Sequence, residues 1–262
     1  MIVDCIEYVV STVRRMPSLR FTYESYIELI ELMQSKDYMI TSYDNFKDYS
    51  KCIILRHDVD YSLQSAYQLA QIEQGIGIKS TYFLLLTSDF YNVFSLSSRK
   101  KIEGILECGH EIGLHFDETR YPKVLKNINN IKDYILEETN ILSKSVGTMI
   151  TKVSMHRPSK SILEANLKIP GIINTYSDTF CKEFKYISDS RRFWREPIED
   201  IIGCELYNRI QILMHPFWYN RKEMNINESV KVFVNSANME RYKMMDKNIS
   251  GLCDIMGQEE IH

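Results

Sequence analysis

At the point that decides its fold, the chain reads Cys52-Ile53-Ile54-Leu55-Arg56-His57-Asp58-Val59-Asp60. A short apolar run of this kind is typical of a strand buried in a parallel sheet, and charges can gather where such a strand leaves the sheet. Asp58 and Asp60 are two residues apart, so they point to the same side if the strand persists. Two carboxylates that close repel each other unless a cation lies between them or one is protonated. Such a pair on its own is more often only a helix cap or a solvated turn, so the rest of the chain must decide.

The composition is that of an ordinary globular protein. The 262 residues are 44% hydrophobic and 26% charged, which is enough for one large core. A net charge of −3 without a basic block gives no reason to expect nucleic acid or an anionic membrane as a partner. Six scattered cysteines without a Cys-x-x-Cys pair argue against a zinc ribbon or a redox dithiol and suit buried thiols in a reducing compartment.

The first residues do not have the order of a signal peptide. Asp4 and Glu7 interrupt the apolar stretch of residues 1–16, and the arginines follow it rather than precede it. No later stretch approaches the length and apolar character of a membrane span. We therefore expect a cytoplasmic protein, and the sequence leaves its oligomeric state open.

Strand-like and helix-like segments alternate from residue 52 to about 246, which predicts a mostly parallel sheet with right-handed crossovers. Strands are expected at 52–57, 79–86, 110–115, 151–155, 172–176, 184–188 and 209–214, and helices at 62–74, 97–107, 123–142, 160–168 and 228–246. The glycine pair at 75 and 77 precedes a strand instead of following one, so a dinucleotide-binding sheet is not favoured. We expect a closed or nearly closed (β/α) barrel of about seven parallel strands.

The sequence predicts three regions. Residues 1–49, with helices expected at 2–14 and 23–36, form an N-terminal helical extension packed on the barrel. The barrel itself takes residues 50–246, and 247–262 form a C-terminal tail.

Polar residues collect where the predicted strands end, which is where functional groups gather in such barrels. The ends read His57-Asp58-Val59-Asp60, His115-Phe116-Asp117, His156-Arg157-Pro158, Asp189-Ser190 and His215-Pro216-Phe217-Trp218. A single histidine there would ordinarily be structural. Four of the six histidines, which must converge on one rim, favour a functional site.

The segment from His110 to His115 does not match the zinc-protease helix. That motif needs histidines four apart on one helix face, whereas these two are five apart with a glycine between them. In a strand this separation sends them to opposite faces. We expect His110 to be structural or to support a metal ligand.

Four motifs resemble those of the polysaccharide deacetylase family (the NodB homology domain), in the same order and with similar spacing. They are His57-Asp58-Val59-Asp60, Gly109-His110-Glu111-Ile112-Gly113-Leu114-His115, Arg157-Pro158 and Leu213-Met214-His215-Pro216. The resemblance covers about residues 50–220 and is greatest to a branch found among bacterial surface-polysaccharide genes. It implies a distorted (β/α) barrel that hydrolyses N-acetyl groups of amino sugars with a divalent metal, of which zinc is the expected ion.

The resemblance also implies roles for individual residues. Asp58 matches the general base, and Arg157 matches the arginine that holds this base. His215 matches the general acid, and Asp189 the carboxylate that tunes it.

The metal ligands depart from the family pattern. Asp60 and His115 match two ligands, but Thr119 stands where the family has a second histidine. A catalytic zinc takes three protein ligands and an open position, so another residue must complete the site. Asp117 lies on the same face as His115 if the strand continues, and His156 ends a neighbouring strand. We prefer His156, because it restores a second imidazole.

These residue types suit amide hydrolysis. A metal polarises the poorly electrophilic amide carbonyl and lowers the pKa of water, and a nearby carboxylate can take the proton. A histidine that titrates near neutral pH can protonate the departing amine. The rings of Trp194, Trp218 and Phe217 can stack on a sugar, although core packing explains each of them at least as well.

The sequence therefore predicts a metal-dependent hydrolase that removes an N-acetyl group from an amino sugar. Because no export signal is recognisable, we expect a free, nucleotide-linked or lipid-linked sugar of bacterial surface-polysaccharide biosynthesis rather than a cell-wall polymer. One alternative is a deformylase or other deacylase on the same scaffold. The other is a degenerate barrel that binds a sugar without hydrolysing it, against which the presence of both Asp58 and His215 counts.

Overall fold

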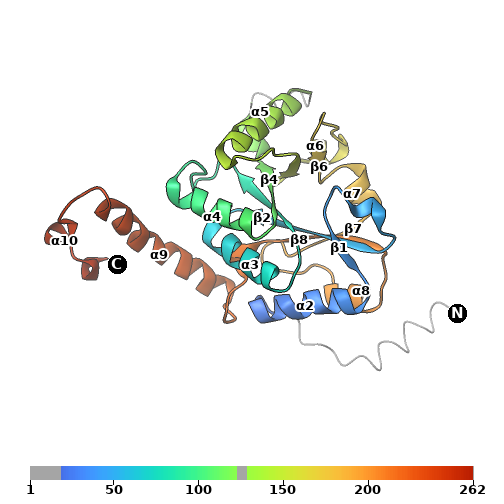
Figure 1. The fold of residues 1–262 in the computed structure, drawn as a ribbon, viewed down its shortest axis with the longest axis horizontal. Helices are drawn as coiled ribbons and strands as arrows, with labels where there is room; N and C mark the ends of the chain where they lie inside the picture. Colours follow the sequence, from blue (N-terminus) through green and yellow to red (C-terminus); the bar gives the residue numbers. More distant parts are fainter. Residues whose placement is uncertain (1–18, 123–128, 262) are drawn as a thin grey trace. The chain divides into compact units, whose positions relative to one another are not determined.

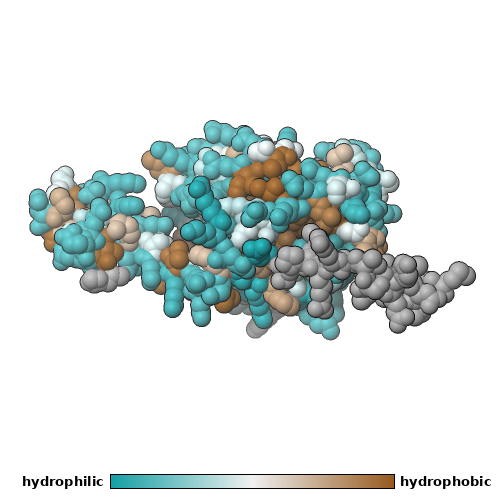
Figure 2. Space-filling model, turned by 90° about the horizontal axis from the view of Figure 1, so that it is seen from below, coloured by the Kyte–Doolittle hydropathy of each residue, from teal (hydrophilic) through white to brown (hydrophobic). Residues whose placement is uncertain are grey.

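A computed structural model describes residues 19–122 and 129–261. The helix expected at 2–14 lies outside the described residues, as do the first residues of the helix expected at 123–142. On the face drawn in Figure 2, hydrophilic residues cover most of the surface and apolar residues gather in smaller patches. Within the described ranges, no helix combines the length and the apolar character needed to cross a bilayer.

A parallel sheet organises the chain, with helices around it (Figure 1). Its strands are β1 (Met39–Thr41), β2 (Cys52–Val59), β3 (Thr81–Leu85), β4 (Glu111–Phe116), β5 (Lys152–Met155), β6 (Ile173–Asn174), β7 (Lys185–Ser188) and β8 (Arg209–Met214). Seven of them follow one path in the order β6-β5-β4-β3-β2-β8-β7, and β1 pairs with the first residues of β2. The path forms a curled half-barrel, which confirms the predicted distorted (β/α) barrel.

Helix α2 (Tyr23–Ser35) precedes the first strand, and helices follow most strands, as the alternation predicts. The latter are α3 (Leu63–Gly75), α4 (Leu96–Glu107), α5 (Asn129–Val146), α6 (Lys160–Glu164), α7 (Asp178–Lys182) and α8 (Ile198–Gly203), with short 3-10 turns at Phe46–Asp48 (η1), Glu118–Arg120 (η2) and Pro216–Trp218 (η3). Ser and Thr side chains begin several of them; for example, Thr22 and Ser62 accept a hydrogen bond from the third backbone N–H beyond them.

Every residue of β2 is buried, and the alternation of its side chains separates two environments. Ile53 and Leu55 pack with apolar residues of α2, α3 and α8 on the outer side of the sheet. Ile54 packs with Phe83 in a second cluster on the other side, which we call the inner side. Asp58 shares this inner side, because it is an even number of residues from Ile54.

A buried carboxylate occupies the outer side of β2. Glu73 of α3 accepts hydrogen bonds from the hydroxyls of Tyr26, Ser80 and Tyr82 at 2.5, 2.7 and 2.6 Å. The His57 Nε2 lies 2.9 Å from the same carboxylate. Burial raises the pKa of Glu73, but its contacts with His57 and the other donors outweigh burial and lower the pKa to about 2. His57 therefore faces the outer side of the sheet. It does not join the other histidines that were predicted at strand ends.

His110 has the structural role that its spacing suggested. Its Nδ1 accepts a hydrogen bond from the backbone N–H of Ser80 at 3.2 Å, so its Nε2–H donates to the Ala70 carbonyl at 2.9 Å. The ring thereby ties the start of β3 to α3.

Glu138 of α5 gives the fold a pH dependence. Its side chain is buried, its Oε1 accepts a hydrogen bond from the Tyr121 hydroxyl, and its Oε2 has no hydrogen-bond partner among the described residues. Burial raises the pKa of Glu138 from 4.5 to about 7. The folded protein therefore keeps a proton that the unfolded chain releases, and stability falls as the pH rises from about 4.5 through 7.

Glu138→Gln, which mimics the protonated acid, should remove this part of the pH dependence. We expect the variant to be more stable than the wild type at pH 8 by on the order of 1–3 kcal/mol, and similar to it at pH 5. Urea unfolding at both pH values measures the difference. The exposed neighbour Glu137→Gln is the matched control and should follow the wild type. The same pH slope in Glu138→Gln and wild type would contradict the prediction.

The chain divides into two compact units between Arg221 and Lys222. The second unit contains α9 (Ile226–Asp246), α10 (Leu252–Ile255) and the 3-10 turn Gln258–Glu260 (η4). A capping box formed by Asn225 and Glu228 starts α9, which confirms the predicted helix. The predicted tail therefore includes short helical segments, and the domain limits at 49 and 246 stay predictions.

Candidate metal and catalytic site

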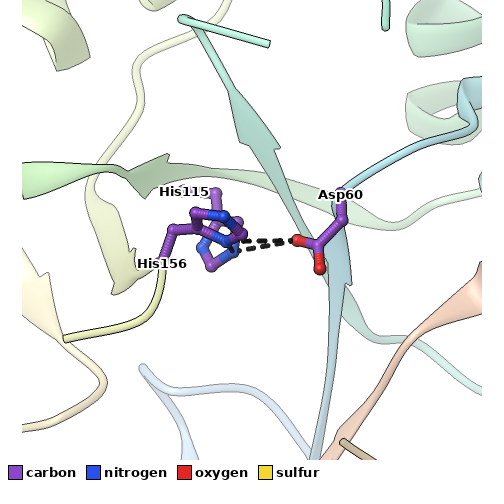
Figure 3. Close-up of side chains that lie close together, drawn as sticks. All are labelled: Asp60, His115 and His156. Carbon is purple, nitrogen blue, oxygen red and sulfur yellow. Dashed lines mark hydrogen bonds and ion pairs between the residues drawn. The ribbon is translucent and has the colours of Figure 1, made fainter. Parts of the chain in front are cut away.

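Three side chains from separate strand ends converge on the inner side of the sheet (Figure 3). Asp60 follows β2, His115 lies in β4 and His156 follows β5. The Asp60 Oδ1 lies 3.2 Å from the His115 Nε2 and 3.4 Å from the His156 Nδ1, and the two nitrogens are 3.1 Å apart. The preferred third ligand, His156, therefore faces the same point as the other two.

The donor set fits a divalent metal ion. Bonds of roughly 2.0–2.2 Å in a tetrahedral site place the donor atoms about 3.3–3.6 Å apart, close to the three separations found here. The Asp60 Oδ1 is buried and makes no well-formed hydrogen bond among the described residues, as expected of an atom that serves a metal. Burial raises the pKa of Asp60, but the contacts with His115 and His156 outweigh it and lower the pKa well below its usual range.

The tautomer of His115 also suits metal binding. Its Nδ1 lies 2.6 Å from the Ser154 hydroxyl, which in turn donates a hydrogen bond to the Asp58 Oδ1 at 3.1 Å. Since Ser154 donates to Asp58, its oxygen accepts from the His115 Nδ1–H. This leaves the lone pair on the Nε2, the atom that faces Asp60.

Asp58 lies beside these three residues and is held by a buried arginine. The Arg56 Nη2 is 3.3 Å from the Asp58 Oδ2, and both side chains are almost fully buried. Arg56 also donates hydrogen bonds to the Thr175 Oγ1 at 2.5 Å and the Tyr176 hydroxyl at 2.9 Å. Burial lowers the pKa of Arg56, but the charge of Asp58 more than compensates and raises the pKa well above its usual range.

Arg157 does not occupy the position that the resemblance implied. Its side chain is exposed, its backbone is left-handed with φ of 48°, and the arginine bound to Asp58 is Arg56. The physical reason is the pleat of β2, in which residues 56 and 58 point to the same side. Sequence reasoning missed Arg56, although its position two residues before Asp58 was the available signal.

His215 and Asp189 form the predicted pair. The His215 Nδ1 lies 2.6 Å from the Asp189 Oδ1, and the backbone N–H of His215 donates to the same carboxylate at 3.0–3.1 Å. Burial lowers the pKa of His215, but the charge and hydrogen bond of the buried Asp189 outweigh this and raise the pKa to about 9. The ring therefore carries a proton near neutral pH, and its Nε2 lies 3.8 Å from the Asp60 Oδ2.

Asp117, the other possible third ligand, has a different role. It precedes η2, and its Oδ1 accepts hydrogen bonds from the backbone N–H and the hydroxyl of Thr119 at 3.0 and 2.7 Å. Asp117 therefore caps η2 and does not join the converging group of Asp60, His115 and His156. Thr119, which replaces the family's histidine, supports this cap.

The aromatic residues divide between core and rim. Trp218 is buried in the apolar cluster of α2 and α8, and Trp194 packs against that cluster. The Phe217 ring lies 4.9 Å from the Tyr61 ring, which also contacts the Phe90 ring at 5.2 Å. Core packing therefore accounts for both tryptophans. Phe217 also packs against this cluster, while its other contact, Tyr61, lies next to Asp60 in the chain.

The structure also contains a cavity of about 770 Å³ at the opposite, N-terminal ends of the strands. Residues before β3 and at the start of β1 line it, among them Met39, Lys79 and Glu111. None of the predicted site residues lines this cavity, so we assign the chemistry to the rim that carries Asp60.

No family model and no curated protein matches the chain. Solved structures match it with modest scores. The catalytic domain of a peptidoglycan N-acetylglucosamine deacetylase from Eubacterium rectale aligns with a TM-score of 0.44 and 15% identity, over 72% of this chain and 85% of that chain. A family 4 carbohydrate esterase from Streptomyces lividans, in complex with acetate, gives 0.43 and 13%, over 70% and 85%.

The matches also include a family 4 pseudoenzyme from Bacillus anthracis, with a TM-score of 0.39 and 11% identity, over 73% of this chain and 62% of that chain. Deacetylases and a pseudoenzyme are thus both among the matched structures.

Proposed function

We propose that this protein is a metal-dependent hydrolase that removes the N-acetyl group of an amino sugar. The observation that carries this proposal is the convergence of Asp60, His115 and His156 beside two further residues. These are Asp58, which is paired with Arg56, and His215, which is paired with Asp189. A binding protein needs a metal at most, whereas a buried carboxylate and an imidazolium on the same rim are the groups that amide hydrolysis requires.

The metal, which we expect to be zinc, would be held by the Asp60 Oδ1, the His115 Nε2 and the His156 Nδ1. When bound, it would polarise the amide carbonyl and make a water molecule more acidic. Three protein ligands leave a fourth position open, as catalytic zinc sites require.

Asp58 would serve as the general base. Arg56 lies against its Oδ2, and its Oδ1 accepts a hydrogen bond from the Ser154 hydroxyl. Its Oδ2 lies 3.8 Å from the His115 Nε2, so a proton acceptor sits directly beside the proposed metal position. Asp58 can therefore take a proton from water at that position.

His215 would serve as the general acid. Asp189 holds its Nδ1–H, which directs the Nε2–H toward the site. A departing amine must gain a proton before it leaves, and an imidazolium at neutral pH can provide it. The proposed base and the proposed acid are thus each held by a buried partner of their own, Arg56 and Asp189.

Substitution of the proposed ligands tests the metal site. His115→Ala and His156→Ala should each weaken zinc binding by more than the roughly 10–100-fold typical of residues that only support a ligand. Asp117→Asn is the matched control and should bind zinc like the wild type, because Asp117 caps η2. Competition with a chromophoric chelator measures the affinities. Weakened binding in Asp117→Asn with wild-type binding in His156→Ala would reverse the assignment of the third ligand.

Acetate release tests the activity. The zinc-loaded protein should release acetate and a free amine from an N-acetylated amino sugar, and the chelated protein should not. Release of formate from N-formyl sugars alone would favour the deformylase. Sugar binding without release of any acyl group would favour the binding barrel.

A further inference from the structure

Arg157 stands beside the proposed metal site without the role that its motif suggested. It directly follows the ligand His156, and its side chain is exposed. The described residues show no ion pair to Arg157, and the carboxylate it was expected to hold is neutralised by Arg56. Among the described residues, the Arg157 guanidinium therefore has no ion pair, and it follows a ligand of the proposed site.

The backbone of Arg157 is held in an unfavourable conformation. A φ of 48° is rare for residues other than glycine, and Pro158 restricts the preceding residue further. Two residues later, the Ser159 hydroxyl donates a hydrogen bond to the buried Glu118 at 2.9 Å, and the Ser159 backbone N–H donates to the same carboxylate. These bonds fix the loop between β5 and α6. Such strained, fixed positions cluster at ligand-binding sites.

A row of aromatic rings begins directly after another ligand of the proposed metal site. Tyr61 follows Asp60 in the chain, and its ring contacts those of Phe90 and Phe217. Asp60, the residue before Tyr61, lies 3.4 Å from His156, the residue before Arg157, so Tyr61 and Arg157 follow two ligands of the same proposed metal site. Phe90 is 56% exposed, so part of the row is open to a ligand. Aromatic faces with one charged group are a usual combination for binding and orienting a small molecule.

We propose that Arg157 binds an anionic group, a phosphate or a carboxylate, on the amino sugar whose ring lies against Tyr61 and Phe217. The inference rests on the proposed function and narrows its substrate class to acidic amino sugars. A guanidinium suits both anions, since it can form two parallel hydrogen bonds with either. A neutral sugar would leave Arg157 without a partner.

Binding to the zinc-loaded Asp58→Asn variant tests this without turnover. The probes are N-acetylglucosamine, its 1-phosphate and N-acetylmuramate, measured by calorimetry. One of the two anionic probes should bind about 10–100-fold more tightly than the neutral sugar, and which one does so identifies phosphate or carboxylate. Adding Arg157→Gln should abolish this preference and change the affinity for the neutral sugar by less than about two-fold. Arg157→Lys should retain part of it, because lysine keeps the charge but loses the paired hydrogen bonds.

Lys79→Gln is the control for loss of one positive charge, since the exposed Lys79 lies at the opposite ends of the strands. It should keep the full preference. Equal binding of all three probes, no binding of either anionic probe, or a preference that survives in Arg157→Gln would each overturn the inference. Efficient hydrolysis of neutral sugars with no preference for anions would overturn it and leave the proposed function intact. Anion binding that depends on Arg157, without acetate release from any sugar, would support the role of Arg157 and overturn the proposed function.

Discussion

Replacing Asp58 with asparagine should lower the rate of amide hydrolysis by about 10²–10⁴-fold, the contribution expected of a general base. Asparagine has nearly the same shape and can still accept the hydrogen bond from Ser154, but it cannot take a proton. Zinc affinity should stay unchanged, because Asp58 is not one of the three converging ligands. Substrate affinity should stay within a few-fold of the wild type.

Asp117→Asn is the matched control for this experiment. Asp117 is also a buried aspartate at a strand end, but it caps η2 and should be dispensable for the reaction. Initial rates of acetate release at saturating sugar, together with zinc titrations, separate catalysis from metal binding. A rate within a few-fold of the wild type in Asp58→Asn would contradict the proposed base.

The second large effect concerns the buried pair of Arg56 and Asp58. Arg56→Met should destabilise the fold by roughly 3–5 kcal/mol, because it leaves the Asp58 charge buried without its partner. The double variant Arg56→Met/Asp58→Asn should recover much of this loss, since no charge remains uncompensated. Urea unfolding of the full chain gives the free energies.

Arg157→Met is the comparison for Arg56→Met, because the sequence motifs alone name Arg157 as the partner of Asp58. Because Arg157 is exposed and Asp58 is bound by Arg56, its loss should change the free energy of unfolding by no more than about 0.5 kcal/mol. A large loss in Arg157→Met with little change in Arg56→Met would show that the arginines have the opposite roles.

The sheet could be predicted from the sequence because its strands are apolar runs between helical patterns. The strand at 209–214 was predicted with the bounds of β8, and β2 extends two residues beyond its predicted end. β1 was missed because three residues are too few for a pattern, and because it lies in a segment with a strong helical signal before it. In the part of the chain that the structure describes, it joins the sheet through its partner β2.

The candidate site could be predicted in part. Strand ends identified Asp60, His115 and His156, but not how closely they approach, which depends on the pairing of β4 with β5. The alternation of side chains along β2 predicts that His57 and Asp58 lie on opposite sides of the sheet and that Arg56 and Asp58 lie on the same side. The motif match assigned Arg157 instead, because a match along the chain does not show the left-handed turn that directs this residue elsewhere.

The most direct test of the account is a crystal structure of the zinc-loaded protein, with anomalous scattering measured at the zinc edge. The account predicts one ion bound at roughly 2.0–2.2 Å by the Asp60 Oδ1, the His115 Nε2 and the His156 Nδ1, with Asp58 beside the open position. An ion elsewhere, or no ion at this site when zinc is in excess, would contradict it.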